Sequence, residues 1–130
     1  MKFEELTIAA FADELASNSP APGGGSVAAL CGVMAAGLTS MVGSLTVGRE
    51  KFKANEAQMQ KILAESEALR AKFTKLMNDD TAAFNTFMDA LHLPKGTDEE
   101  KAARSAAIQE ATKFAALVPM QVARNAYELM

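Results

Sequence analysis

One carboxylate in this sequence lies where an apolar side chain is expected. Asp80 falls between Leu76 and Phe84 at helical spacing, inside a stripe of apolar residues. An ionised carboxylate on a packed face is costly without a partner, so we expect Asp80 to be paired, protonated or lining a cavity. Desolvation there would suit it to proton transfer, whereas the alternative is a structural ion pair with a Lys or Arg of another helix. Its neighbour Asp79 is displaced by about 100° and should be solvated.

A glycine-rich segment is the second feature that could bind a ligand. The run Pro20-Ala21-Pro22-Gly23-Gly24-Gly25-Ser26 leads directly into a predicted helix. The free N–H groups and the dipole of a helix start attract an anion or an electron-rich edge, and glycines allow close backbone approach. The segment matches neither a P-loop nor Gly-x-Gly-x-x-Gly, so phosphate binding is unsupported. An ordinary loop between helices is the alternative.

Basic residues in two places could hold the carboxylates of a ligand. Arg104 lies on the apolar stripe of the last predicted helix and could pair with Asp80 or grip a carboxylate in a forked contact. Arg49, Lys51 and Lys53 form a second cluster. Both groups also have a simpler interpretation, because long basic side chains commonly reach solvent at helix ends.

The remaining reactive side chains are poor candidates for catalysis. His92 lies at a predicted helix end, with no evident partner for a catalytic triad. Cys31 lies in an apolar helix and is expected to be a small core residue. As the only cysteine it excludes an intrachain disulfide, and one His with one Cys argues against zinc. We therefore predict neither a metal nor a cofactor.

The composition predicts one helical domain. The chain has 130 residues, of which 49% are hydrophobic but only 6% aromatic. An apolar content dominated by Ala, Leu, Met and Val suits close-packed helices better than sheets. A net charge of -3 gives no electrostatic reason to bind nucleic acid or an anionic membrane. The acidic start and the single cysteine favour a reducing, cytoplasmic setting.

Four helices are predicted to position these residues. The first spans residues 3–16, and the second spans residues 27–47 with Ser26 as its cap. The third spans residues 56–91 and carries a regular apolar stripe. The fourth is capped by Thr97 or Asp98 and contains Pro119, which should kink it.

The second predicted helix is apolar on all sides, so other helices or a membrane must cover it. It is uncharged over about 21 residues, which is enough to span a bilayer. It is rich in Ala, Gly, Ser and Thr, which favours a buried helix in a soluble bundle over a membrane span. Because it is apolar all round, we expect it to lie centrally and to need more cover than four helices give. That need predicts a homodimer.

Several ordered motifs resemble the formimidoyltetrahydrofolate cyclodeaminase and methenyltetrahydrofolate cyclohydrolase family. Residues 19–29 are similar to its glycine-rich signature, and residues 45–52 to its Leu-Thr-x-Gly-basic-x-basic-aromatic segment. Phe52 stands where tyrosine is more usual, so any hydroxyl role there is absent. Residues 80–84 resemble its Asp-x-x-Ala-Phe element, and Leu93-Pro94-Lys95 and Ala116-Leu117-Val118-Pro119 match in type and order. Family domains are usually longer, so we expect residues 1–130 to form one domain that lacks the family's C-terminal helices.

The resemblance implies an all-α bundle of long antiparallel helices that is dimeric and acts in one-carbon folate metabolism. The implied reaction is cyclodeamination of 5-formimidoyltetrahydrofolate to 5,10-methenyltetrahydrofolate and ammonia, with methenyltetrahydrofolate cyclohydrolase as the alternative. Asp80 would be the acid or base. The folate, including polyglutamylated forms, would be held by Pro22, Gly23, Gly24, Gly25, Ser26, Arg49, Lys51 and Arg104. A non-catalytic helical assembly module is the alternative of another class.

Overall fold

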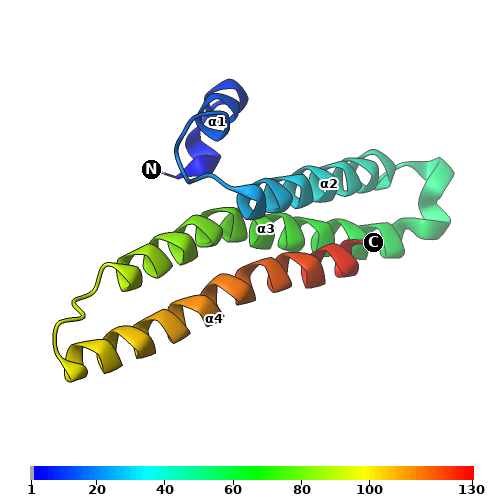
Figure 1. Ribbon diagram of the computed structural model, residues 1–130. Helices are drawn as coiled ribbons and strands as arrows, with labels where there is room; N and C mark the ends of the chain where they lie inside the picture. The colour runs from blue at the N-terminus through cyan, green and yellow to red at the C-terminus, as the bar shows by residue number, and fades with distance from the viewer. Residues whose placement is uncertain (1) are drawn as a thin grey trace.

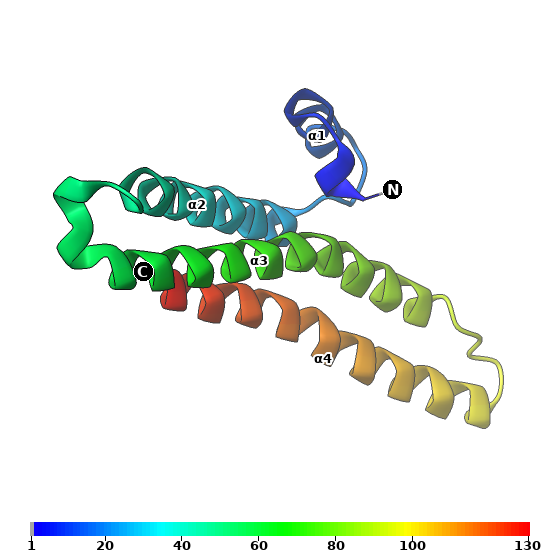
Figure 2. The ribbon, with the colours of Figure 1, turned by 180° about the vertical axis from the view of Figure 1, so that it is seen from behind.

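The computed structural model describes residues 2–130 and contains four α-helices over that range, with no strand. The helices are α1 (Ile8–Leu15), α2 (Gly24–Thr46), α3 (Glu56–Leu91) and α4 (Asp98–Leu129), and two short 3-10 segments are η1 (Phe3–Glu5) and η2 (Glu50–Asn55). The long helices run antiparallel side by side with α3 in the middle, and α1 stands at the N-terminal end of α2 (Figures 1 and 2). The predicted all-α bundle of long antiparallel helices is confirmed.

Helix α3 provides the core of the molecule because its large apolar residues recur at helical spacing. Phe73 is fully buried, and Leu76 and Met77 are nearly so. A Cβ atom placed on Gly32 of α2 would lie 2.4 Å from the Phe73 ring. Glycine at that position therefore lets the ring seat directly against the α2 backbone, where its burial contributes roughly 2–3 kcal/mol. The third predicted helix, residues 56–91, is confirmed at both ends.

Helix α2 corrects the expectation that it would lie centrally. Its fully buried residues are all small, Val27, Leu30 and Val33 are half-buried against the core, and its other large side chains are exposed. The buried positions are Ser26, Ala29, Gly32, Ala36, Ser40 and Gly43. By length and composition α2 is the helix, among the described residues, that could cross a membrane. The expectation of a central position was wrong because it was based on hydrophobicity. The buried face of α2 is instead marked by the small size of its side chains.

The helix ends follow local capping chemistry. The first predicted helix is interrupted, because the Thr7 side chain caps a new start at Ile8 and leaves residues 3–5 as a separate turn. Of the two predicted caps of α4, Thr97 is the one that the structure shows, and it forms a capping box with Glu100. Helix α4 continues past Pro119 to Leu129. Ser26 is not the cap of α2; Gly23 occupies that position and has no side chain to offer.

Candidate functional site

Asp80 supplies the cap that Gly23 cannot. The backbone N–H of Ser26, in the first turn of α2, donates to Asp80 Oδ2 at 2.9 Å, and the Ser26 hydroxyl lies 3.2 Å from the same oxygen. A carboxylate carried on α3 therefore closes the N-terminus of α2. The partner of Asp80 is a helix start rather than a Lys or Arg, and the carboxylate accepts a backbone N–H that the helix itself leaves without a partner.

Gly25 is required by this contact. A Cβ atom at position 25 would lie 2.0 Å from Asp80 Oδ1 and 2.4 Å from its carboxyl carbon. Any side chain there must displace the carboxylate. Gly24, in contrast, has no atom within 4 Å of its Cβ position. The glycine run thus has two roles: Gly25 admits Asp80, and Gly24 leaves open space at the helix start.

Ser26 connects α2 to α3 and is fully buried. Its hydroxyl donates to the Met77 carbonyl oxygen at 2.8 Å and lies 3.5 Å from the Thr81 hydroxyl. With its oxygen surrounded by these partners, Ser26 has no free group for a ligand. The structure therefore places Ser26 behind the site as a positioning residue for Asp80, not as a direct binder of substrate.

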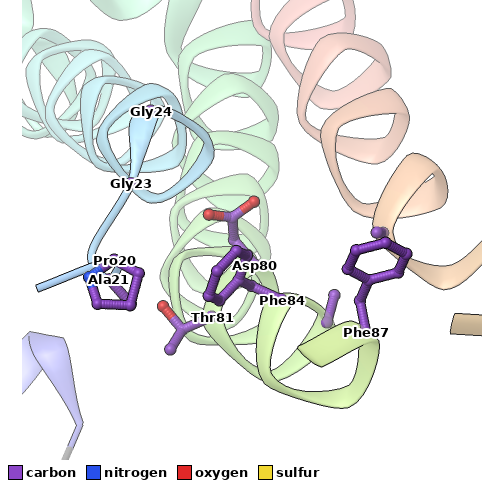
Figure 3. Close-up of a pocket in the computed structure, with 10 residues that line it drawn as sticks. Pro20, Ala21, Gly23, Gly24, Asp80, Thr81, Phe84 and Phe87 are labelled. Carbon is purple, nitrogen blue, oxygen red and sulfur yellow. The ribbon is translucent and has the colours of Figure 1, made fainter. Parts of the chain in front are cut away.

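A cavity of about 260 Å³ opens beside Asp80, between the glycine-rich segment, α3 and α4. Figure 3 shows the Asp80 carboxylate below Gly24, the Thr81 side chain and the Phe84 ring on the side of Pro20 and Ala21, and the Phe87 ring extending toward α4. Its lining is Pro20, Ala21, Gly23, Gly24, Asp80, Thr81, Ala83, Phe84, Phe87 and Ala115. A concave, mostly apolar pocket with one carboxylate and one hydroxyl suits a planar aromatic ligand that exchanges a proton. Pro22 is buried and does not line the cavity.

Arg49 and Lys51 lie at the other end of α2. Both are exposed in or beside η2, and the Lys51 ammonium sits 5.5 Å from the centre of the Phe52 ring. The 23 residues of α2 separate them from Gly24 by about 35 Å. Within one chain, the structure does not bring these two predicted ligands to the cavity.

Arg104 corrects another expectation. Its Nε and Nη2 atoms donate to the Leu91 carbonyl oxygen at 3.3 and 3.1 Å, so it satisfies the C-terminal end of α3 and does not pair with Asp80. It lines a separate cavity of about 350 Å³ together with Lys95 and Lys101. The pairing prediction was wrong because the acceptor is a backbone carbonyl, which no side-chain pattern reveals.

The other side chains considered from the sequence lie outside the cavity. Cys31 is exposed on α2, contrary to the expected core position. His92 is exposed at the end of α3, with Nδ1 2.6 Å from the Met88 carbonyl oxygen. Asp79 forms an ion pair with Lys75. Within residues 2–130, no group of three or more His, Cys, Asp or Glu side chains is placed to share a metal ion.

Sequence reasoning missed the aromatic wall of the cavity. Phe84 and Phe87 belong to the apolar stripe of α3 and were assigned to helix packing. They follow Asp80 at spacings of four and seven residues, so they share its face of the helix. That shared face was the available signal: aromatic side chains on the same stripe as an unexplained carboxylate line the same space.

Comparisons with known proteins agree with this geometry. The protein family described as formiminotransferase-cyclodeaminase matches residues 7–130. A methenyltetrahydrofolate cyclohydrolase of Methylorubrum extorquens is 49% identical over 124 residues, covering 95% of this chain and 60% of that protein. The formimidoyltransferase-cyclodeaminase of Sus scrofa is 42% identical over 119 residues, covering 92% of this chain and 22% of that protein.

A solved structure resembles the fold closely. The crystal structure of formiminotetrahydrofolate cyclodeaminase from Thermotoga maritima matches with a TM-score of 0.81 and 34% identity, over 97% of this chain and 59% of that one. The chain therefore spans at most about three-fifths of the length of these relatives.

Proposed function

Because this chain belongs to the formiminotransferase-cyclodeaminase family, we propose that it transfers protons at the one-carbon unit of a tetrahydrofolate derivative. The observation that carries the proposal is the meeting of the Asp80 carboxylate and the glycine-lined start of α2 in one cavity. The family match and the names of the relatives supply the substrate class, and the cavity supplies a place for its chemistry.

The first reaction proposed is cyclodeamination of 5-formimidoyltetrahydrofolate. The bridge nitrogen of the folate attacks the formimidoyl carbon, and a new C–N bond closes the five-membered ring. Starting from the protonated formimidoyl group (CH=NH₂⁺), the bridge nitrogen loses its proton and the departing nitrogen gains one. The departing nitrogen then leaves as ammonia, and the product is the 5,10-methenyltetrahydrofolate cation. Both proton transfers occur within one bond of the same carbon, so a single positioned carboxylate can serve them in turn.

Asp80 is suited to begin as the base in this sequence. The Ser26 N–H donates to Oδ2 and so fixes the position of the carboxylate. Because the carboxylate lies on the wall of the cavity, it can accept the proton from the bridge nitrogen and then return it to the departing nitrogen. The Phe84 and Phe87 rings offer apolar surface for a flat ring system, and the Thr81 hydroxyl offers a hydrogen-bonding group beside it.

Hydrolysis of 5,10-methenyltetrahydrofolate is the second candidate reaction. The 49% identity with a methenyltetrahydrofolate cyclohydrolase favours it. Here water attacks the same carbon and loses a proton to Asp80, which passes it to the ring nitrogen as the bond from that carbon to the ring nitrogen breaks. The remaining hydroxyl proton is released to solvent as the formyl C=O of 10-formyltetrahydrofolate forms. The two candidates share the cavity and the base and differ in the nucleophile.

The test is an assay of the purified chain with both folates. Asp80→Asn keeps an oxygen that can accept from Ser26 N–H but removes the base, so we expect a folded protein whose kcat falls by about 10²–10⁴-fold. Asp79→Asn, one residue away in an ion pair with Lys75, is the matched control and should retain activity. If the unmodified chain turns over neither folate and binds neither, the non-catalytic assembly module becomes the better description.

A cytoplasmic location is part of the same proposal. The single cysteine, which allows no disulfide within the chain, supports it. Fractionation of cells that express the chain would test it, with recovery in the membrane pellet as the contrary result.

A further inference from the structure

A second cavity, of about 350 Å³, lies at the turn between α3 and α4 and is rich in basic side chains. Its charged lining residues are Lys95, Lys101 and Arg104, and no carboxylate of residues 2–130 belongs to the lining. A hydroxyl and an amide lie beside these cations, because the rest of the lining is Ser105, Ile108 and Gln109. This basic cavity is therefore suited to an anionic ligand that also accepts hydrogen bonds.

The protein's own groups leave most of this positive charge available. Within residues 2–130, no ion pair engages Lys95. Arg104 donates from Nε and Nη2 to the Leu91 carbonyl oxygen, so three of its five N–H donors remain for a ligand. The Lys101 ammonium lies 3.0 Å from an Asp98 carboxylate oxygen, but both side chains are mostly exposed, and an ion pair of that kind is weak enough to exchange for a ligand.

The basic cavity and the Asp80 cavity lie along the same edge of the α3–α4 pair. Ile108 of the basic cavity precedes Ala115 of the Asp80 cavity by seven residues, so the two side chains share one face of α4, about 10 Å apart. On α3, Phe87 lines the Asp80 cavity, and the Leu91 carbonyl oxygen, one turn later, accepts the guanidinium N–H groups of the basic cavity. Helices α3 and α4 lie side by side in both views (Figures 1 and 2).

We propose that the basic cavity binds the glutamate carboxylates of a folate whose reacting ring occupies the Asp80 cavity of the same chain. The identity of the ligand rests on the proposed function. In a folate, a p-aminobenzoyl group joins the bridge nitrogen to the glutamate, and standard bond lengths place the first carboxylate about 9 Å from that nitrogen. This length matches the separation of the two cavities along α4, which is about 10 Å.

The surface between the two cavities suits the p-aminobenzoyl group. Phe87 and Leu91 of α3 and Ile108 of α4 are half-buried there and offer an apolar surface to a flat ring. Charge also fixes the direction of the ligand. Asp80 is the one charged residue that lines its cavity and repels the carboxylates, whereas the basic cavity attracts them.

A substrate without glutamate gives a sharp test. We expect the wild-type chain to have a kcat/KM at least tenfold higher for the folate that it turns over than for the corresponding pteroate, which ends at the p-aminobenzoate carboxylate. In the Lys95→Ala, Lys101→Ala double variant this preference should fall to less than about twofold, because the cations that distinguish the two substrates are gone. A double variant that keeps the wild-type preference would overturn the proposal.

The control variant is Lys113→Ala. Lys113 pairs with Glu110 three residues before it on the exposed surface of α4, as Lys101 pairs with Asp98, but it does not line the basic cavity. The Lys113→Ala variant should keep the preference for glutamate. Arg104 is left unchanged in these variants, because its loss would also release the end of α3.

A binding measurement does not depend on turnover. We expect p-aminobenzoylglutamate to shift the amide NMR resonances of residues 95–109 in the ¹⁵N-labelled chain, to bind at least fivefold more weakly to the double variant, and to bind more weakly as salt is added. Absence of these shifts in the wild-type chain would contradict the proposal, and so would equal affinity for the wild type and the double variant.

The outcomes separate this inference from the proposed function. If the wild-type chain turns over no folate but p-aminobenzoylglutamate binds at the basic cavity, the carboxylate site stands and the folate chemistry fails. If the chain turns over a folate and its pteroate equally well, the proposed function stands and the carboxylate site is wrong.

Discussion

Two serines of α2 face α3 in similar ways, yet only one of them adjoins a site. Ser26 near the helix start and Ser40 two-thirds along it are both buried and both hydrogen-bond across the interface. Ser40 meets the Ser66 hydroxyl at 2.8 Å in closed packing, whereas Ser26 meets the carboxylate of Asp80 beside a cavity. A buried serine that hydrogen-bonds across the α2–α3 interface therefore adjoins a candidate site only where its partner is a carboxylate that lines a cavity.

The glycines near these serines extend the comparison and give the largest expected effect. Gly25→Ala places a Cβ atom 2.0 Å from Asp80 Oδ1, so the carboxylate must rotate away. We expect loss of the α2 cap at about 1 kcal/mol of unfolding free energy, and loss of turnover at least as large as in Asp80→Asn. Steady-state kinetics and urea unfolding measure the two effects.

Gly43→Ala is the matched control at the far end. Its Cβ would lie 3.2 Å from the Leu63 Cβ atom, so Leu63 must shift by a few tenths of an ångström, and the gain in helix propensity of up to about 1 kcal/mol offsets this. We expect little change in stability and none in turnover. Equal loss of turnover in both glycine variants would contradict the assignment of the site to the start of α2.

Replacing each serine with alanine should have a smaller effect than the glycine substitution. The two variants should distinguish an effect on kcat from an effect on the free energy of unfolding. Ser26→Ala removes the hydroxyl contacts with Asp80 and Met77 but keeps the backbone bond from residue 26 to Asp80. We expect a loss of about 1–2 kcal/mol of unfolding free energy and a fall in kcat of about tenfold, with KM nearly unchanged.

Ser40→Ala should lower stability to a similar or smaller extent, because Ser66 keeps its bond to the Leu63 carbonyl oxygen at 3.0 Å. Its kcat should equal that of the wild type. A lower kcat in Ser40→Ala would show that looseness between α2 and α3, rather than placement of Asp80, limits the reaction.

The comparison also shows what the sequence could predict. Helices α3 and α4 were predictable because large apolar residues recur along them and Thr97 and Glu100 mark a start. Asp80 was identifiable because a charge interrupts an apolar stripe. The partner of Asp80 could not be identified, because it is the backbone N–H of Ser26 on another helix. A hydrogen bond to a backbone group leaves no pattern of side chains in the sequence. Helix α2 was misplaced because periodicity of small residues is hidden when every residue is apolar or small.

Lowering the pH should weaken the half of the α2–α3 interface that lies farthest from Asp80, and Glu67 is the residue responsible. This loss of stability is the smallest effect that we predict. The hydrogen bond from Arg70, followed by one from Ser40, lowers the pKa of Glu67 from 4.5 to about 2. A lowered pKa in the folded state contributes stability that is fully present above pH 4.5 and is lost as the pH falls from 4.5 through 2. Because Glu67 is partly open to solvent, screening keeps this contribution small.

Glu67→Gln should remove this part of the acid dependence. Urea unfolding at pH 5 and pH 3 would show a smaller difference in unfolding free energy for the variant than for the wild type, while kcat at pH 7 stays unchanged. Added salt should reduce the wild-type difference, since the Arg70 contact is exposed. A change in kcat at pH 7 would mean that the two ends of the α2–α3 interface are coupled, and that a cap formed at Ser26 depends on packing about 14 residues, or roughly 20 Å, away at Ser40.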